Sequence, residues 1–439
     1  MRHRHAPTRP LALAVAVALA SATLPTLAAS AATRTETRAA SLPTAARSVT
    51  TRSAATTLSP TDQAIHDDLT RRSTRTALGP DLAGLVTDAE TGQVLWSQTP
   101  REHQLPASNT KLVTAVNALS TFGPTHTIKT KVVQGKTHRR LVLVGGGDPS
   151  LSRGNLTTLA KAVTLGLRAR GLRTVRVLVD DSLFPAPTIA YGWKSSYVPT
   201  DVRAVRALVV NQHQVSDTSM NAGRVFAKRL VAQGLKVRVV VRHKARANAT
   251  VLATVHGRSM ASMVGTMLRD SDNDYAEALH RLVAIKTGHA PTWGGARNAQ
   301  RAALTRLGID LGTATLYDGS GLSRADRLAP LDIVRVLSLA FDGAHPDLAS
   351  LRHNSLAIAG RTGTLAPKYL RYVTAPTKCA AGLIEGKTGS LRGVIALSGF
   401  ARGADGKIKL FSFLLNRVPA TLTTRQAVDR LATTITGCW

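Results

Sequence analysis

The chain has 439 residues, of which 44% are hydrophobic, 19% charged and 4% aromatic, and its formal net charge is +31 at pH 7. This length exceeds that of one ordinary core and predicts at least two folded units. The charge favours polyanionic partners, but the scarcity of aromatic residues and the lack of a zinc-finger or RNA-binding motif exclude a typical nucleic-acid-binding protein.

The N-terminus has the pattern of a secretory signal. Three arginines fall within the first nine residues, an apolar run covers residues 11–24, and Ala29-Ser30-Ala31 supplies small residues for cleavage. The alternative, a transmembrane anchor, needs about 20 apolar residues, and Pro25 interrupts this run. We predict a signal peptide over residues 1–31 and a secreted protein, extracellular or cell-wall associated. Anionic cell-wall polymers or a membrane surface then suit the charge better than nucleic acid does.

The next segment, residues 32–60, is rich in Ala, Ser, Thr and Arg and lacks apolar periodicity, which predicts a flexible basic linker. Residues 81–98 contain two apolar strands around a Glu-Thr-Gly turn, the pattern of a hairpin. Apolar residues then recur at helical spacing from Leu112 to Leu119. Ser108 is therefore expected at the first turn of a buried helix.

Short strands and helices alternate between residues 125 and 250, and two apolar helices follow within residues 259–288. Three strand patterns lie within residues 381–416, and residues 423–435 predict a closing helix. Strands near both ends with helices between them predict an α+β fold. We expect one unit from residues 61–124 and 251–439, and an inserted domain over residues 125–250.

Ser108 and Lys111 form the first candidate catalytic pair. Positions three apart on a helix share a face, so the lysine can reach the serine. A serine hydroxyl needs such a base to act as a nucleophile, and a lysine must be buried or lie near other cations to act as one. The structural alternative is a helix-capping serine beside a solvated lysine. Taken alone, a serine followed three residues later by a lysine is more often structural than catalytic.

Two further triplets supply the remaining groups of such a site. Ser271 and Asn273 lie between two predicted helices, where they could relay a proton and hold a substrate amide, with Asp272 turned away. Lys387-Thr388-Gly389 lies on a predicted strand and offers a cation, an alcohol for a carboxylate and an open strand edge. The backbone N–H groups of Ser108 and Ser390 could form an oxyanion hole. The order SxxK, SDN, KTG is that of penicillin-binding proteins and class A β-lactamases.

Arg361-Thr362-Gly363 resembles the third triplet and is a competing candidate. The sequence after it contains Pro367, which is incompatible with an inner strand. The residues after Lys387 can continue as a strand, so we assign the third triplet to Lys387.

Cys379 and Cys438 are the two cysteines. In an oxidising compartment an isolated pair is more often bridged than free, which favours a disulfide between the chain terminus and a loop. Two thiols without a paired histidine do not make a metal ligand set, and no H-E-x-x-H spacing occurs. We expect no metal and no cofactor.

Residues 80–417 resemble the low-molecular-mass penicillin-binding proteins of the D-Ala-D-Ala carboxypeptidase and endopeptidase type, the DacB-like serine peptidases. The motifs that carry the resemblance are PASNTKL, LVGGGDPSL, VDDSLF, YGWKSS, SDNDYAEAL, DGSGLSRADRLAP and GKTGSLRGVIALSGF. It implies a transpeptidase-like fold, an antiparallel sheet with an all-α lobe, carrying an inserted α/β-type domain. It also implies peptidoglycan stem peptides as substrates and β-lactam antibiotics as acylating inhibitors.

By this resemblance, Ser108 would be acylated by the penultimate D-Ala, with Lys111 as base and Ser271 and Asn273 as relay and clamp. Lys387 and Thr388 would bind the terminal carboxylate. Relatives often carry an acidic residue shortly after the Gly-Trp pair, where this chain has residues 194–196, Lys-Ser-Ser. The chain departs from the family there.

Two other functions remain as alternatives. A serine β-lactamase or esterase shares the motifs, but a class A enzyme deacylates with a glutamate, usually in an E-x-x-L-N loop, and none of the five glutamates begins one. The other alternative is a catalytically inactive wall-binding protein, whose function would depend on its positive charge alone. A binding role does not require the set of two serines, two lysines and an asparagine found here.

Overall fold

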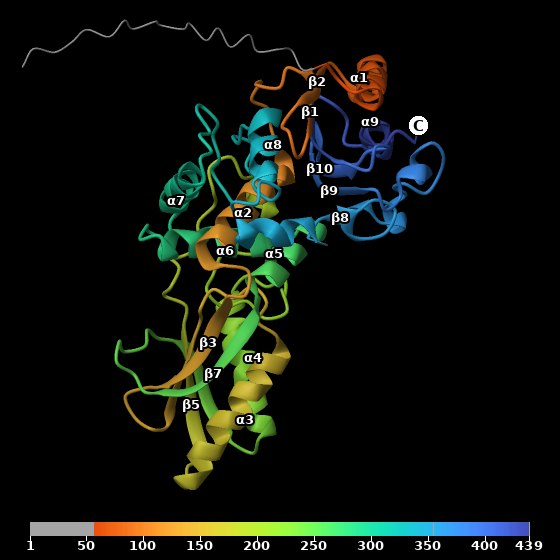
Figure 1. The fold of residues 1–439 in the computed structure, drawn as a ribbon. Coiled ribbons are helices and arrows are strands. Elements are labelled where there is room, and N and C mark those ends of the chain that lie inside the picture. Colours follow the sequence, from red (N-terminus) through yellow and green to blue (C-terminus); the bar gives the residue numbers. More distant parts are fainter. Residues whose placement is uncertain (1–56, 354, 439) are drawn as a thin grey trace, which may run out of the picture. The chain divides into compact units, whose positions relative to one another are not determined.

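The computed structural model describes residues 57–353 and 355–438. The predicted signal peptide, residues 1–31, and most of the predicted linker lie outside the described residues. Two sheets are present, one built from both ends of the described chain and one from its middle, each with helices packed against it (Figure 1). The predicted α+β class is confirmed.

The larger sheet is antiparallel and has the strand order β2-β1-β11-β10-β9-β8. Its strands are β1 (Asp81–Asp88), β2 (Val94–Gln98), β8 (Ala357–Ile358), β9 (Ile384–Leu391), β10 (Val394–Arg402) and β11 (Ile408–Asn416). Alternate side chains enter different cores: Leu410 and Leu414 face one, and Phe411 and Phe413 face the other. The sheet is therefore buried on both faces.

Five helices form the core on one face of this sheet and two cover the other face. The five are α2 (Thr110–Phe122), α5 (Met260–Arg269), α6 (Asn273–Lys286), α7 (Trp293–Arg306) and α8 (Pro330–Ser338). The two are α1 (Pro60–Ser73) and α9 (Leu422–Ile435). The sequence patterns predicted helices α2, α5, α6 and α9. They did not predict α1, α7 and α8, whose apolar residues are few or form only a short periodic stretch.

Helix α1 is attached to the large sheet through a buried lysine. Lys409, on β11, is 0% exposed, and its Nζ lies 2.7 Å from Asp62 of α1, 3.0 Å from Asp88 of β1 and 3.0 Å from Asp405. A buried cation of this kind is tolerated only with such partners. Residue 60, the end of the predicted linker, is already the first residue of α1, which Ser59 caps.

The smaller sheet has the order β6-β5-β4-β3-β7. Its strands are β3 (Thr127–Gln134), β4 (Arg140–Val144), β5 (Thr174–Asp180), β6 (Lys236–Arg242) and β7 (Val251–Ser259). β4, β5 and β6 are parallel, and α3 (Arg153–Ala169) and α4 (Thr218–Ala232) supply their crossovers. Because β7 pairs with β3, the inserted unit extends to Ser259 and the predicted limit at residue 250 is too early.

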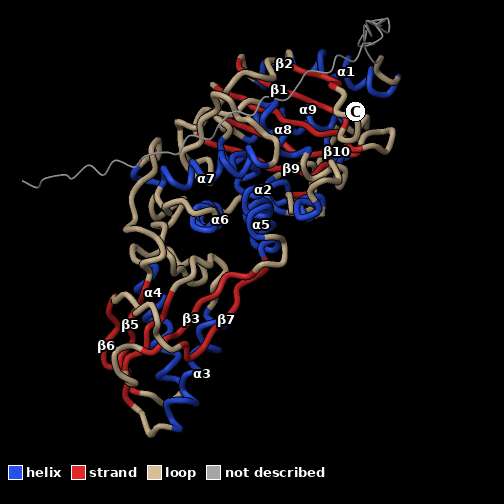
Figure 2. Tube along the Cα trace, turned by 60° about the vertical axis from the view of Figure 1, so that its left-hand side comes forward, coloured by secondary structure: helices blue, strands red, loops and turns tan. Residues whose placement is uncertain are grey.

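Figures 1 and 2 both place α5 and α6 between the two sheets, and the chain passes from β7 directly into α5. The loop after β5 also returns to the helical core: Trp193 Nε1 donates to Asp318 at 2.6 Å, and Arg203 forms an ion pair with Asp274 of α6. The inserted unit therefore supplies residues that pack around the helices carrying the predicted site.

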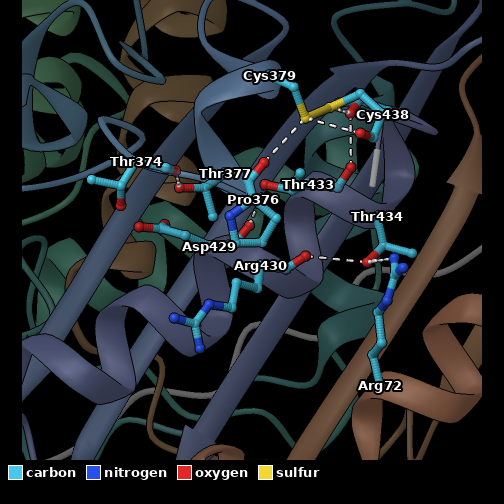
Figure 3. The surroundings of a disulfide bond; sticks show 11 residues. Arg72, Thr374, Pro376, Thr377, Cys379, Asp429, Arg430, Thr433, Thr434 and Cys438 are labelled. Carbon is cyan, nitrogen blue, oxygen red and sulfur yellow. Dashed lines mark hydrogen bonds between the residues drawn. A yellow bond between two sulfur atoms is a disulfide. The ribbon is translucent and has the colours of Figure 1, made fainter.

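The structure joins Cys379 and Cys438 in a disulfide, with the Cα atoms 6.0 Å apart. Figure 3 shows the bridge beside α9, where Arg72 of α1 also donates to Thr434 at 2.9 Å. The bridge ties the residues after α9 to the 3-10 turn Thr377–Ala380, just before β9. Among the described residues, every helix is too short or too polar to cross a bilayer.

Candidate active site

Ser108 lies in the 3-10 turn Ala107–Asn109, which leads directly into α2. Ala107 has a φ of +47°, in the left-handed region, which costs a non-glycine residue energy and is found most often at functional sites. A Cβ on Gly321 would lie 1.9 Å from the Ala107 carbonyl oxygen. The turn that presents Ser108 is thus held by close contact with a glycine of a distant segment.

Lys111 lies on the first turn of α2 with its side chain directed at Ser108. Its Nζ donates to Ser108 Oγ at 3.0 Å, to Asn273 Oδ1 at 2.6 Å and to the Ser320 carbonyl at 2.7 Å. The residue is 0% exposed. The alternative of a solvated lysine beside a capping serine is therefore incompatible with the structure.

Burial lowers the pKa of Lys111 to about 8, from an ordinary value of 10.5. The carboxylates of Asp318, Glu277 and Asp272 act in the opposite direction and limit this shift. Burial, and then the charge of Lys111, place the pKa of Lys387 well below its ordinary value. Two buried lysines in one site therefore make a neutral amine available near neutral pH.

Ser271 and Asn273 come from the junction between α5 and α6, as predicted. Ser271 has a φ of +60°, the second non-glycine residue of the site in the left-handed region. Asp272 caps α6 by accepting from Tyr275 N at 3.0 Å, which accounts for its turning away from Ser108. Asn273 contacts Lys111 through Oδ1 and donates through Nδ2 to the Asp201 carbonyl at 2.8 Å.

Lys387 brings the third triplet to the same place. It lies on β9, is 0% exposed, and donates from Nζ to Ser271 Oγ at 2.8 Å and to its neighbour's carbonyl, Thr388 O, at 2.7 Å. Thr388 Oγ1 donates to Thr364 Oγ1 at 2.8 Å. Lys111 thus joins Ser108 to Asn273 while Lys387 contacts Ser271, so the three triplets meet at the turn that carries Ser271 and Asn273.

A cavity of about 220 Å³ opens beside these residues. Ser108, Ser271 and residues 388–390 of β9 line it, together with Ile395 and Ala396 of β10 and four polar or cationic side chains that the sequence patterns did not predict. Those four are Thr364, Tyr369, Arg371 and Arg425. The cavity has room for part of a peptide, and its unpredicted lining is largely hydrogen-bonding or cationic.

The two arginines of the cavity differ in their partners. Arg371 is buried and forms a two-pronged ion pair with Asp429 of α9, so its charge is neutralised inside the protein. Arg425, on the first turn of α9, is half-buried and donates to Ser390 Oγ at 3.4 Å. Within residues 57–353 and 355–438, it forms no ion pair with a carboxylate. Arg425 therefore keeps its charge for an anion in the cavity.

The register of β9 leaves its backbone open toward the cavity. Leu391 and Val394 flank a two-residue hairpin turn and pair directly, so Ser390 opposite Ile395 occupies a position without ladder hydrogen bonds. Its N–H group points away from β10, and β8 pairs only with Gly386 and Glu385. This part of β9 presents a free strand edge, which an extended peptide can join.

Residues 318–326 position Lys111, because the Ser320 carbonyl accepts a hydrogen bond from its Nζ. No role in the site was predicted for this segment from the sequence. Glu277, buried on α6, accepts from Ser320 N at 2.8 Å, and Asp318 accepts from Gly321 N at 2.7 Å. These bonds fix the Ser320 carbonyl that receives Lys111. Burial and the charge of Asp318 raise the pKa of Glu277 to about 8. The motif DGSGLSR was the sequence signal for this segment.

The competing triplet, Arg361-Thr362-Gly363, is not part of a central strand. It follows the two-residue strand β8 and enters the 3-10 turn Gly363–Leu365. Its Gly363 packs with Arg269, where a Cβ would lie 2.3 Å from the carbonyl oxygen. The structure therefore places Lys387, not Arg361, beside Ser271.

The chain is similar to known proteins over most of its length. The sequence matches the D-Ala-D-Ala carboxypeptidase 3 (S13) family over residues 65–214 and 199–435. It is 34% identical over 388 residues to Carboxypeptidase Rv3627c of Mycobacterium tuberculosis, covering 82% of each chain. It is 33% identical over 395 residues to Carboxypeptidase DacB of Mycolicibacterium smegmatis, covering 84% of this chain and 85% of that one.

The fold is shared with a solved structure of more distant sequence. Penicillin binding protein 4 (dacB) from Haemophilus influenzae superposes with a TM-score of 0.71 at 19% identity, covering 84% of this chain and 99% of that chain. The family match spans every residue of the candidate site, and the two mycobacterial relatives cover most of the sequence. The chain therefore belongs to the D-Ala-D-Ala carboxypeptidase 3 (S13) family and is a serine-type D-Ala-D-Ala carboxypeptidase.

Proposed function

We propose that Ser108 attacks the penultimate D-Ala carbonyl of a peptidoglycan stem peptide and that Lys111 removes the hydroxyl proton. The observation that carries this assignment is the 3.0 Å hydrogen bond between Lys111 Nζ and Ser108 Oγ, made by a lysine whose pKa burial lowers to about 8. Lys387 donates instead to Ser271 Oγ and Thr388 O, and among the described residues it forms no hydrogen bond with Ser108. Lys111 is therefore the base for the first step.

The oxyanion of the tetrahedral intermediate would be held by the N–H groups of Ser108 and Ser390. The free edge of β9 supports this role, because the Ser390 N–H is turned from its neighbouring strand toward the cavity. When the C–N bond breaks, the departing D-Ala amine needs a proton. Ser271, which receives a hydrogen bond from Lys387, lines the cavity and is placed to pass one on.

The terminal carboxylate of the substrate would bind at Lys387 and Thr388, with Gly389 allowing the backbone of the peptide to lie against β9. A Cβ on Gly389 would lie 2.9 Å from Pro106 O, so only glycine fits there. Arg425 joins this set from α9, because it faces the cavity and makes no internal ion pair among the described residues. Water would then hydrolyse the acyl-enzyme and regenerate Ser108.

The acylation rate should depend on pH through Lys111. A base must be neutral, and below a pKa of about 8 the neutral fraction of an amine falls tenfold per pH unit. We therefore expect kcat/KM for a D-Ala-D-Ala peptide to rise about tenfold per unit from pH 6 to pH 7 and to level off above pH 8. A profile that is flat over this range, measured by D-Ala release, would contradict Lys111 as the base.

β-Lactams are proposed to acylate Ser108 and to leave slowly. Four of the five glutamates lie in the described residues, at 90, 102, 277 and 385, and none of these four lines the cavity to direct a hydrolytic water at an acyl-enzyme. A fluorescent penicillin should therefore label the protein one to one, and mass spectrometry should place the label on the peptide containing Ser108. The labelled fraction should persist for hours after free drug is removed. Rapid loss of label with many turnovers would indicate a β-lactamase instead.

The balance between carboxypeptidase and endopeptidase activity is a separate proposal. We expect both products, because the free edge of β9 continues past Lys387 to Ser390, where Arg425 of α9 approaches, and can accept a carboxylate on D-Ala or on a cross-linked residue. Digestion of purified monomeric and dimeric muropeptides, followed by mass spectrometry, distinguishes the two. Loss of D-Ala from monomers with intact dimers would restrict the enzyme to carboxypeptidase action.

The location is proposed to be outside the cytoplasm, secreted or cell-wall associated. The disulfide between Cys379 and Cys438 supports this, because such bonds persist in oxidising compartments. Fractionation of cells expressing the full chain, with N-terminal sequencing of the mature protein, tests it. A cytoplasmic protein that keeps Met1 would contradict the proposal.

A further inference from the structure

The inserted unit carries most of the positive charge of the chain. Residues 125–259 contain 23 Lys and Arg, five Asp and no Glu, which gives a net charge of +18 out of +31 for the whole sequence. This charge is distributed unevenly. The five aspartates lie toward one end: Asp148 follows β4, Asp180 ends β5 with Asp181 directly after it, Asp217 caps α4, and Asp201 contacts Asn273.

The opposite end of the small sheet collects cations because of its topology. β4, β5 and β6 are parallel, so the turns that precede them meet at one end of the sheet. These turns lie in segments 134–141, 166–177 and 233–239, none of which contains an acidic residue. We call their nine cations the basic pole: Lys136, Arg139, Arg140, Arg168, Arg170, Arg173, Arg176, Lys236 and Arg238.

Hydrogen bonds connect the three segments of the basic pole. Arg176 N donates to Arg139 O at 2.8 Å, and Lys236 N donates to Arg173 O at 2.8 Å. Arg168 donates from Nη2 to the Gln233 carbonyl at 2.7 Å. Figure 1 shows the end of α3 at the tip of this unit, on the side away from α5 and α6. The nine cations therefore belong to one surface.

The protein itself does not neutralise this surface. Among the residues that the structure describes, the ion pairs of the inserted unit involve Arg203, Arg206 and Arg242, at the aspartate end, and none involves the basic pole. Eight of the nine side chains are exposed and Arg140 is half-buried. Arg140 and Arg176 are direct neighbours across β4 and β5, an unfavourable pairing of like charges. Binding of an external polyanion would reduce the repulsion between these cations.

Two exposed aliphatic side chains lie next to the basic pole. Leu165, on the last turns of α3, is 70% exposed, and Val231, one residue before the end of α4, is 55% exposed. The ends of these two helices touch through Arg168 and Gln233. A soluble polyanion gains nothing from such side chains. A bilayer surface binds both components, because the headgroup region accepts aliphatic side chains and its phosphates attract cations.

We propose that the basic pole, with Leu165 and Val231, docks the protein on a bilayer that carries anionic lipids. Seven of the nine cations are arginines, whose planar guanidinium binds phosphate through two hydrogen bonds. None of these residues lines the catalytic cavity, so docking and peptide hydrolysis use separate surfaces. The inserted unit then holds the catalytic unit at the membrane.

The test is sedimentation of the full chain with phosphatidylcholine vesicles, alone or with about a third phosphatidylglycerol. We expect binding only to the anionic vesicles and release at high salt. Arg139→Gln, Arg173→Gln and Lys236→Gln together remove one cation from each segment and should lower the partition coefficient roughly a hundredfold. The pair Leu165→Ser and Val231→Ser should lower it by about tenfold at constant charge.

The matched control removes three exposed cations from the catalytic unit, by Arg101→Gln, Arg306→Gln and Lys407→Gln. This control should keep the wild-type partition coefficient, and all variants should release D-Ala from a soluble peptide at the wild-type rate. An equal loss of vesicle binding in the control would show diffuse attraction and overturn the proposal. Indifference to the aliphatic pair, with equally tight binding to soluble polyphosphate, would assign the surface to a polymer and overturn it as well.

Discussion

Replacement of Ser108 by alanine should reduce release of D-Ala by at least about 10⁴-fold and abolish covalent labelling by penicillin. The substitution removes the only atom that can form the acyl-enzyme in this mechanism, while the helix, the cavity and the two lysines remain. Lys111 keeps its hydrogen bonds to Asn273 and Ser320, so the fold should not change. Kinetics on a D-Ala-D-Ala tripeptide and gel fluorescence measure the two losses.

The control for this variant is Ser120→Ala, near the end of the same helix. Ser120 donates to the carbonyl of Asn117 at 3.3 Å and does not line the cavity. It should retain both activities within about twofold and lose at most about 1 kcal/mol of unfolding free energy. Labelling of Ser108→Ala at the wild-type level would place the nucleophile elsewhere and contradict the assignment.

Lys111→Met should abolish acylation without destabilising the protein. The folded-state pKa of Lys111, about 8, lies below the ordinary value of 10.5, so at pH 7 its charged form opposes folding by about 3 kcal/mol. That cost is absent above pH 10.5 and fully present below pH 8. Methionine removes it, and the loss of hydrogen bonds to Asn273 and Ser320 offsets part of the gain. We expect an acylation rate reduced by 10³-fold or more and a melting temperature that does not fall.

Lys409→Met is the matched control, because both lysines are 0% exposed. Lys409 pairs with Asp62, Asp88 and Asp405, and these partners raise its pKa above the ordinary value despite its burial. Its charge therefore supports folding at pH values below about 10.5 at which the three aspartates are ionised. The variant should lose about 3 kcal/mol of unfolding free energy and keep acylation in the folded fraction. If Lys111→Met were the less stable of the two, the inferred role of burial would be wrong.

Local patterns were sufficient for the elements that carry chemistry. The apolar runs of β10 and β11 between turn signals, the helical spacing in α2 and the SDN junction between two apolar helices all predicted the observed elements. Helix α1 was not predicted because its apolar residues, Ile65 and Leu69, are few. They are buried only through α9 and the large sheet, a context that a local pattern does not contain.

The residues of the site also divide into those that the sequence could predict and those that only packing brings there. Ser108, Lys111, Ser271, Asn273 and Lys387 could be selected because each belongs to a short motif with a chemical purpose. Arg425 and Thr364 belong to no such motif, and they reach the cavity only because α9 and the turn after β8 pack beside β9.

The sequence by itself determined the candidate catalytic groups, the α+β class and the excess of positive charge, because these depend on residue types and on spacings within one or two turns of chain. Only the tertiary structure decided that Lys111 is buried, that Thr364 and Arg425 reach the cavity, and that nine cations gather at one end of the small sheet. Burial and the meeting of distant segments set the pKa of a lysine and the charge of a surface, and neither can be read from neighbours in the chain.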